Sequence, residues 1–219
     1  MAVIPPQLGN RYDELRNFFG GEGPYLKPLK YLGKGANNFA VLYAEFDRDT
    51  EKRKAVVKTS IKAAFEQALL DDLGFGNVGG ADDLDREIGA LQRFTGDKAH
   101  IVKLLSVIDN LQRARQSGPG PTQSSILIQE YVPNGTLQRL VNRVGRRNLP
   151  DRLISSIFLC LVRIATELAY QAENGDGIPS DGNIAPSNLA HCDLTWSNLV
   201  FGEVLGGEHD PWPILKAIE

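Results

Sequence analysis

The sequence is poor in the residues that build disulfide frameworks and metal centres. Among its 219 residues it has two cysteines, Cys160 and Cys192, and three histidines. So few cysteines argue against a disulfide framework, and we expect a protein of a reducing compartment. His100 and His209 have no neighbours at the spacing of metal ligands, which argues against a zinc site.

An excess of basic charge is also missing. The chain has 24 Lys and Arg residues against 27 Asp and Glu residues, which gives a net charge of −3 at pH 7. A protein whose main partner is nucleic acid needs clustered cationic side chains in excess, because they neutralise phosphates. We therefore expect no nucleic acid partner, and a mildly acidic enzyme fits better.

No long uninterrupted hydrophobic run is present. The most apolar stretch, residues 153–170, is broken by two serines, a threonine, an arginine and a glutamate, which makes it too polar to span a bilayer. The N-terminus has no charged segment followed by an apolar one, so no secretory signal is expected. These features predict no membrane partner and an intracellular location, in the cytoplasm or the nucleus.

The chain has enough apolar residues, 42%, to bury a core, and its length allows one domain or two lobes. Residues 26–32, 39–46 and 54–60 have the short apolar pattern that predicts three antiparallel strands. Helix formers fill residues 61–73 and 82–94, and helical spacing marks a short leader helix at 10–19. Residues 100–109 and 124–132 are further strand candidates that complete a small sheet.

After residue 132 the pattern becomes helical. Residues 133–144 begin with turn residues and continue with leucines and valines at helical spacing, and residues 149–173 are apolar over most of a helix circumference. Residues 198–205 and 213–218 predict a hairpin. The predicted fold class is α+β, with an antiparallel sheet followed by a mainly helical part.

A glycine-rich segment lies between the first two predicted strands. In Gly33-Lys34-Gly35-Ala36-Asn37-Asn38 the glycines let backbone N–H groups approach phosphate oxygens, and Asn38 is suited to a positive φ. Taken alone, such a segment is most often an ordinary turn. Neither Gly-Lys-Ser nor Gly-Lys-Thr follows it, which disfavours a P-loop nucleoside triphosphatase.

Further features follow in order along the chain. Lys58 ends a strand-like run, Glu87 lies in a predicted helix, and residues 126–132 form an apolar strand that leads into Pro133-Asn134-Gly135. The last feature is the octet HCDLTWSN, residues 191–198, in which Asn198 follows Asp193 by five positions. Each feature alone is ordinary, as a solvated lysine, a charged helix residue, a strand end or a polar turn.

Together and in this order, these features resemble the signature of the eukaryotic protein kinases. The resemblance runs from about residue 26 to the last residue. It implies a leader at residues 1–24, a kinase N-lobe with an antiparallel sheet at 25–131, and a hinge with an incomplete, mainly helical C-lobe at 132–219. It also implies ATP and Mg²⁺ as cofactors, and a protein substrate phosphorylated on Ser or Thr rather than Tyr.

The resemblance implies a role for each residue that matches the family pattern around the phosphates. The backbone at Gly33 and Gly35 would cover the phosphates of ATP. Lys58 would hold the α and β phosphates, oriented by an ion pair to Glu87.

Other matching residues are implied to serve the adenine and the chemistry. Glu130 and Val132 would present backbone groups to the adenine, with Gln129 in the gatekeeper place. Asp193 would accept the proton of the substrate hydroxyl, and Asn198 would bind a Mg²⁺ ion.

Several residues depart from the family pattern. Cys192 replaces the arginine that answers activation-loop phosphorylation, and Thr195 replaces a lysine near the γ phosphate. Val56 replaces the small residue that the family has, two positions before the lysine, on the same strand. Either Ala40 or Val41 takes the valine position after the glycine turn. The spacing of the family pattern falls on Ala40, and Val41 comes one position later, so the register stays open.

The resemblance places Glu219 at the metal-binding Asp of the D-F-G motif, and the later motifs are absent. The helix expected from Asp151 should then leave an apolar face uncovered, which favours association through that face. Two alternatives stay open. One is a nucleotide-binding pseudokinase or scaffold, favoured by Thr195 and Glu219. The other is a small-molecule phosphotransferase of the aminoglycoside kinase type, although EYVPNG and the order of Lys58 before Glu87 favour the protein kinase.

Overall fold

The computed structural model describes most of the two predicted parts of the chain. The described residues are 26–35, 38–47, 49–60, 81–93, 99–105, 126–145, 148–170, 190–205 and 209–218, with Tyr12, Asp13, Leu15, Phe19 and Ser187. The helix expected at residues 61–73 lies outside them. Two compact units are present, Met1–Gly89 with Leu104–Tyr131, and Ala90–Lys103 with Val132–Glu219.

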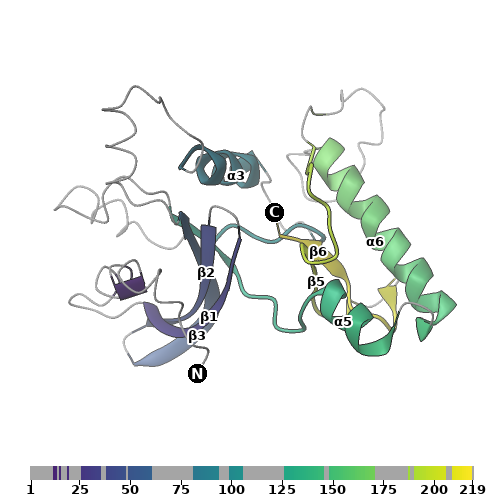
Figure 1. Ribbon diagram of the computed structural model, residues 1–219, viewed down its shortest axis with the longest axis horizontal. Coiled ribbons are helices and arrows are strands. Elements are labelled where there is room, and N and C mark those ends of the chain that lie inside the picture. Colours follow the sequence, from purple (N-terminus) through teal and green to yellow (C-terminus); the bar gives the residue numbers. More distant parts are fainter. Residues whose placement is uncertain are drawn as a thin grey trace. The chain divides into compact units, whose positions relative to one another are not determined.

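The first unit contains a four-stranded antiparallel sheet (Figure 1). Its strands are β1 (Leu26–Lys34), β2 (Asn38–Asp47), β3 (Thr50–Ser60) and β4 (Ile126–Glu130), hydrogen-bonded in that order. The three antiparallel strands predicted from the alternating apolar pattern are confirmed, as is the strand expected within residues 124–132. With helix α3 (Ala81–Arg93) and the helices of the second unit, the fold class is α+β.

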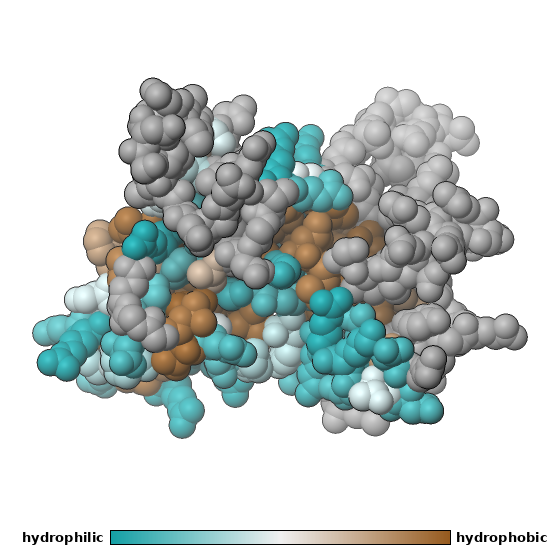
Figure 2. Space-filling view, turned by 180° about the vertical axis from the view of Figure 1, so that it is seen from behind, coloured by the Kyte–Doolittle hydropathy of each residue, from teal (hydrophilic) through white to brown (hydrophobic). Residues whose placement is uncertain are grey.

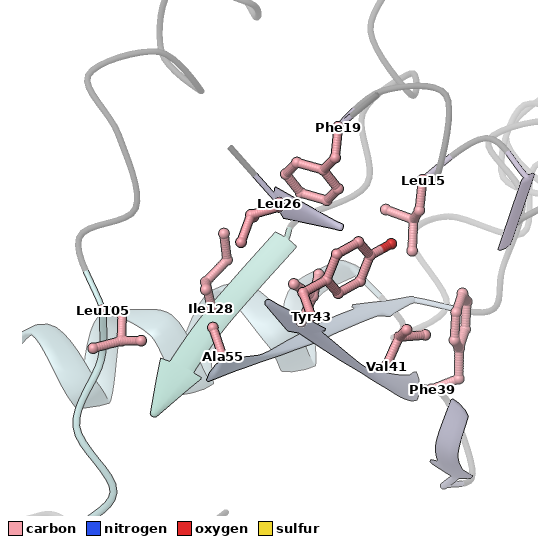
Figure 3. Close-up of a cluster of buried hydrophobic side chains, with 10 residues drawn as sticks. Leu15, Phe19, Leu26, Phe39, Val41, Tyr43, Ala55, Leu105 and Ile128 are labelled. Atoms are coloured by element: carbon pink, nitrogen blue, oxygen red, sulfur yellow. The ribbon is translucent and has the colours of Figure 1, made fainter. Parts of the chain in front are cut away.

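One face of this sheet carries the core of the first unit (Figure 3). Val41, Tyr43, Val57 and Ile128 alternate with residues of the opposite face, as the period of a strand requires. Side chains from outside the sheet complete the cluster, whose buried members are Leu15, Phe19, Leu26, Phe39, Val41, Tyr43, Ala55, Val57, Leu105 and Ile128. The predicted leader segment therefore contributes to the core through Leu15 and Phe19, which are in helical conformation.

Residues 100–105 do not form the continuous strand that the sequence predicts. Val102 N–H donates to Ala217, and Ala217 N–H donates to His100, so the first residues pair with the second unit's β6 (Leu215–Ala217). Leu105 N–H instead donates to Ile128 in β4 of the first unit. Because the segment divides its hydrogen bonds between two sheets, it forms isolated bridges at Ile101 and Leu104 only. The rest of the predicted strand, 106–109, lies outside the described residues.

The second unit packs helices against a two-stranded sheet (Figure 1). Helix α5 (Leu137–Val144) begins after Thr136, whose hydroxyl oxygen accepts a hydrogen bond from Arg139 N–H at 3.2 Å. Helix α6 (Asp151–Ala169) contacts β6, and β5 (Leu199–Phe201) pairs antiparallel with β6. This confirms the predicted hairpin. The buried members of its core are Ile101, Leu137, Val141, Cys160, Ile164, Leu199, Phe201, Leu215 and Ala217.

Helix α6 also has an apolar stripe that faces solvent. Ile154, Phe158 and Val162, spaced four residues apart, are 47%, 67% and 44% exposed. The uncovered face expected on this helix is therefore present. Figure 2 shows brown, apolar side chains reaching the surface among teal, polar ones. Within the described part of the chain, none of the helices is long and apolar enough to cross a membrane.

A buried group of polar side chains lies beside β6. The rings of His100 and His209 are 5.0 Å apart, and His209 Nδ1 is 3.7 Å from Cys160 Sγ. His100 Nδ1 donates to the carbonyl of Leu215 at 2.9 Å, and Leu215 N–H donates to the same Cys160 sulfur at 3.4 Å. These contacts fix β6 to helix α6. The contacts of His100 join residues more than 100 positions apart, and those of Cys160 join residues 49 and 55 positions apart. Nothing in the sequence pattern indicated them.

Candidate functional site

Among the described residues of the first unit, the most buried charged side chain is that of Lys58, on β3. Its side chain is 6% exposed, and its Nζ atom forms an ion pair with Glu87 Oε1 on helix α3, at 2.8 Å. Removing an ammonium group from water is costly unless a partner compensates it. The ion pair supplies that compensation and holds the lysine in one orientation. The pair that the kinase resemblance implies between these two residues is therefore present.

The sheet register places Lys58 in line with the glycine turn. Gly33 on β1 lies opposite Ala40 on β2, and Ala40 lies opposite Lys58 on β3. Residues directly opposite one another share a face of the sheet, so these three lie on one face, away from the core cluster. Ala40, and not Val41, therefore lies on the same sheet face as Lys58. Val41 is fully buried in the core cluster on the other face.

The glycines of the turn are not required by the fold of the turn itself. Neither Gly33 nor Gly35 has a positive φ, and a Cβ added at Gly33 would meet nothing within 4 Å. Gly35 N–H donates to the Asn38 carbonyl at 2.8 Å, which closes the turn. The expectation of a positive φ at Asn38 is wrong, because this residue starts β2 in extended pairing with Ser60. The absence of a side chain at Gly33 therefore leaves open space on the sheet face that Gly33 shares with Ala40 and Lys58.

A residue missed by the sequence reasoning is Leu32, immediately before Gly33. The register of β1 shifts between Tyr31 and Gly33, so Leu32 is an extra residue in the pairing with β2. Its side chain is 39% exposed beside the glycine turn. A bulge redirects a side chain, and here it presents an apolar group next to the open backbone. The one signal in the sequence for Leu32 was its place directly before the Gly-x-Gly segment.

The strand that leads out of the first unit carries Gln129 on the same face as Lys58. Gln129 lies opposite Val56 and is 4% exposed, and its Oε1 atom has no hydrogen-bond partner among the described residues. Glu130 follows at the end of β4, opposite Ala55, and Val132 is half-buried at the start of the next segment. A buried amide oxygen without a donor is costly, and a ligand N–H group would relieve that cost.

In the second unit, the octet forms a loop held by its own hydrogen bonds. Asn198 Nδ2 donates to Asp193 Oδ2 at 2.9 Å and to the Asp193 carbonyl at 3.0 Å. Asp193 N–H donates to the His191 carbonyl, and Thr195 N–H donates to the Asp193 carbonyl. Cys192, before the aspartate, has a φ of 57°, which an L residue rarely adopts. The loop therefore fixes Asp193, which is exposed, against Asn198, which is buried.

The residue after strand β6 forms a hydrogen bond with this loop. Ile218 N–H donates to the Asn198 carbonyl at 3.0 Å, so β6 ends next to Asn198. Glu219, expected as a metal ligand, follows directly but lies outside the described residues. Among the residues that the structure does describe, no group of three or more His, Cys, Asp or Glu side chains could hold a metal ion.

No protein-family model matches this sequence, and no curated protein matches it. The assignment of a function therefore depends on the residues themselves. The first unit brings together Gly33, Lys58 and Glu87, and the second unit brings together Asp193 and Asn198. Each unit thus contains part of the residue set that the resemblance implies.

Proposed function

We propose that this chain has a protein kinase fold, binds ATP with Mg²⁺, and transfers the γ-phosphoryl group to a hydroxyl of a protein substrate. The observation that carries this proposal is the buried ion pair between Lys58 and Glu87. Lys58 lies on the same sheet face as Gly33, through the cross-strand pairs of both residues with Ala40. A phosphate site needs a fixed cation and backbone groups that no side chain covers. Lys58, held by Glu87, supplies the cation, and Gly33 supplies the uncovered backbone.

The first unit supplies the groups that bind the nucleotide. Phosphate oxygens approach the backbone at Gly33 and Gly35, where no side chain blocks them. Lys58 donates to the phosphates, and the ion pair with Glu87 holds its ammonium group in one orientation. Gln129 Oε1, which has no donor among the described residues, accepts a hydrogen bond from the amino group of the base. The set favours adenine, because adenine carries an amino group where guanine carries an oxygen.

The second unit supplies the groups that act on the acceptor. Asp193 is exposed, and one of its carboxylate oxygens accepts the Asn198 amide, which leaves Oδ1 to accept the proton of the substrate hydroxyl. The hydroxyl oxygen forms a bond to the γ phosphorus, the bond to the β–γ bridging oxygen breaks, and ADP leaves with that electron pair. Asn198 Oδ1 is an oxygen ligand of the kind that Mg²⁺ prefers. When bound, Mg²⁺ neutralises charge on the phosphate oxygens.

One feature of the loop favours slow transfer. Thr195 carries no charge, and its Oγ1 atom lies 2.8 Å from Ser197 Oγ, so the two hydroxyls bond to each other. The loop therefore contributes no cation to the charge that develops on the transferred group. This observation supports the second candidate, a pseudokinase that binds nucleotide with little or no transfer.

Binding and transfer measured side by side test the proposal. ATP affinity is measured by calorimetry with Mg²⁺, and transfer is measured with radiolabelled γ-phosphate, for the natural chain, Asp193→Asn and Glu203→Gln. Glu203 is an exposed carboxylate of the same unit and serves as the control. We expect Asp193→Asn to bind ATP normally and to lose transfer by about 10²-fold or more, with Glu203→Gln unchanged.

Other outcomes distinguish the alternatives. ATP binding without transfer in the natural chain would favour the pseudokinase. Transfer to aminoglycosides but to no peptide would favour the small-molecule phosphotransferase. Absence of ATP binding would refute the proposal.

A further inference from the structure

Two large apolar side chains are exposed on the loop that carries Asp193. Leu194 is 41% exposed and Trp196 is 37% exposed, whereas the apolar residues that follow in β5 are buried. Across residues 190–202 the sequence has no Lys, Arg or Glu, and Asp193 is its only Asp. The loop that carries the proposed catalytic carboxylate therefore presents two apolar side chains and no lysine or arginine.

The backbone of this loop is fixed before any substrate binds. The carbonyl of Trp196 accepts a hydrogen bond from Gln138 N–H on helix α5 at 2.9 Å. Asn198 N–H donates to the Thr195 carbonyl at 3.0 Å, and the Asn198 amide holds Asp193. An apolar contact formed on a rigid backbone costs little ordering entropy, and this makes it effective in recognition.

The residue types also favour a recognition role. An exposed tryptophan loses hydration when a partner covers it, and tryptophan is enriched among the residues that dominate binding energy. A surface residue with no such role is more often polar, as Thr195 and Ser197 are in the same loop. Leu194 directly follows the reacting carboxylate in the sequence and Trp196 follows Thr195, so both are within three positions of Asp193.

We propose that Leu194 and Trp196 form an acceptor subsite, which selects peptides with an aliphatic or aromatic side chain directly beside the phosphorylated hydroxyl. The inference rests on the proposed kinase function, because it names the acceptor of that same site. Peptides with Asp or Glu at that position gain no contact from the loop, and the Asp193 carboxylate repels them.

Intrinsic fluorescence tests the subsite without requiring activity. The chain has two tryptophans, so Trp212→Phe leaves Trp196 as the only one. This variant is titrated with two peptides that differ only beside the serine, one with Leu and one with Asp. We expect the Leu peptide to shift the emission to shorter wavelength and to bind at least about tenfold more tightly, because binding covers the indole.

Steady-state kinetics supply the second readout. Trp196→Ala should raise KM for the Leu peptide by about tenfold with kcat little changed, since the side chain binds the acceptor and takes no part in the chemistry. Val204→Ala, which truncates another exposed apolar side chain of the same unit, should leave KM unchanged. Equal affinity for the two peptides, or an unchanged KM in Trp196→Ala, would refute the subsite. Tight binding of the Leu peptide without transfer would instead refute the kinase activity and leave the subsite in place.

Discussion

Lys58 Nζ and Glu87 Oε1 are 2.8 Å apart, and they join strand β3 to helix α3 although 29 positions separate them in the chain. Both side chains are largely shielded, at 6% and 16% exposure. A pair this buried contributes little net stability, because its attraction is offset by the water that each charge gives up. Its value is orientation, since it holds the ammonium group of a lysine that shares a sheet face with Gly33.

The first prediction concerns that ammonium group. Lys58→Met should lower kcat/KM for ATP by about 10²-fold to 10³-fold, because it removes a fixed charge from the phosphates. Lys54→Met is the matched control, since Lys54 is an exposed lysine on the same strand and the same face. The measurement is phosphoryl transfer as a function of ATP concentration. Equal losses in the two variants would indicate a general effect of charge.

The second prediction separates a functional glycine from a structural one. Gly33→Val should leave the free energy of unfolding unchanged or slightly higher, because a side chain there meets open space and φ is not positive. ATP affinity should fall by at least about tenfold. Gly202→Ala should do the reverse. Its added Cβ would lie 3.0 Å from Ile214 Cγ1, so it should destabilise the chain by about 1–3 kcal/mol.

The third prediction concerns the metal dependence of Asn198. Asn198→Ala removes the amide oxygen proposed to bind Mg²⁺ and the N–H donors that hold Asp193. Transfer should fall by at least about 10-fold, and the Mg²⁺ concentration for half-maximal rate should rise. A titration of rate against Mg²⁺ at fixed ATP measures both. An unchanged Mg²⁺ requirement would remove Asn198 as a ligand, whatever happened to the rate.

The fourth prediction uses the buried oxygen of Gln129. Gln129→Met keeps the size of the side chain but removes a buried acceptor that has no donor among the described residues, so the free energy of unfolding should rise by about 1 kcal/mol. Discrimination between ATP and GTP should weaken at the same time. Competition binding with the two nucleotides measures it. Gln138→Met, on helix α5, should leave the nucleotide preference as it is.

The fifth prediction concerns alkaline pH. Burial, with a smaller contribution from the charge of Tyr12, raises the pKa of Tyr43 well above its ordinary value near 10. Between pH 10 and the raised pKa of Tyr43, the unfolded chain releases the phenol proton while the folded chain keeps it. The free energy of unfolding should therefore fall by up to about 1.4 kcal/mol per pH unit.

Denaturant unfolding at pH 8 to 11 checks this slope. Tyr43→Phe should remove Tyr43's share of the slope. It should also stabilise the chain by about 1 kcal/mol at neutral pH, because the Tyr43 hydroxyl is buried without a partner among the described residues. Tyr170→Phe, at the end of α6, is the control for the same chemical change. A slope that is equal in Tyr43→Phe and the natural chain would contradict the account of Tyr43.

Local patterns predicted much of the fold. The alternation that places Val41 and Val57 on one face and Lys58 on the other is a property of the strands themselves, so β1 to β3 could be read from the sequence. The structure of residues 100–105 could not be read from the sequence. His100 and Val102 form hydrogen bonds with β6 of the second unit, whereas Leu105 forms one with β4 of the first unit. The bulge at Leu32 was equally invisible, since it reflects the pairing of β1 with β2.

The candidate site shows the same limit. The order of glycine turn, lysine, glutamate and octet pointed to Lys58 and Glu87 as partners, and they form an ion pair. The bond from Asn198 to Asp193 occurs in a loop where Cys192 has a positive φ, and the sequence indicated neither feature. The contact between His100 and His209 joins distant parts of the chain and has no local signal.

The central proposal is that Lys58 binds the phosphates of ATP. An ATP derivative with a reactive acyl phosphate transfers its acyl group to a lysine near the phosphates, and mass spectrometry of the digest identifies that lysine. We predict labelling of Lys58, protection by excess ATP, and weaker labelling in Asn198→Ala at limiting probe and Mg²⁺. Labelling spread over exposed lysines such as Lys30 and Lys54, with Lys58 unmodified and no protection by ATP, would contradict the account.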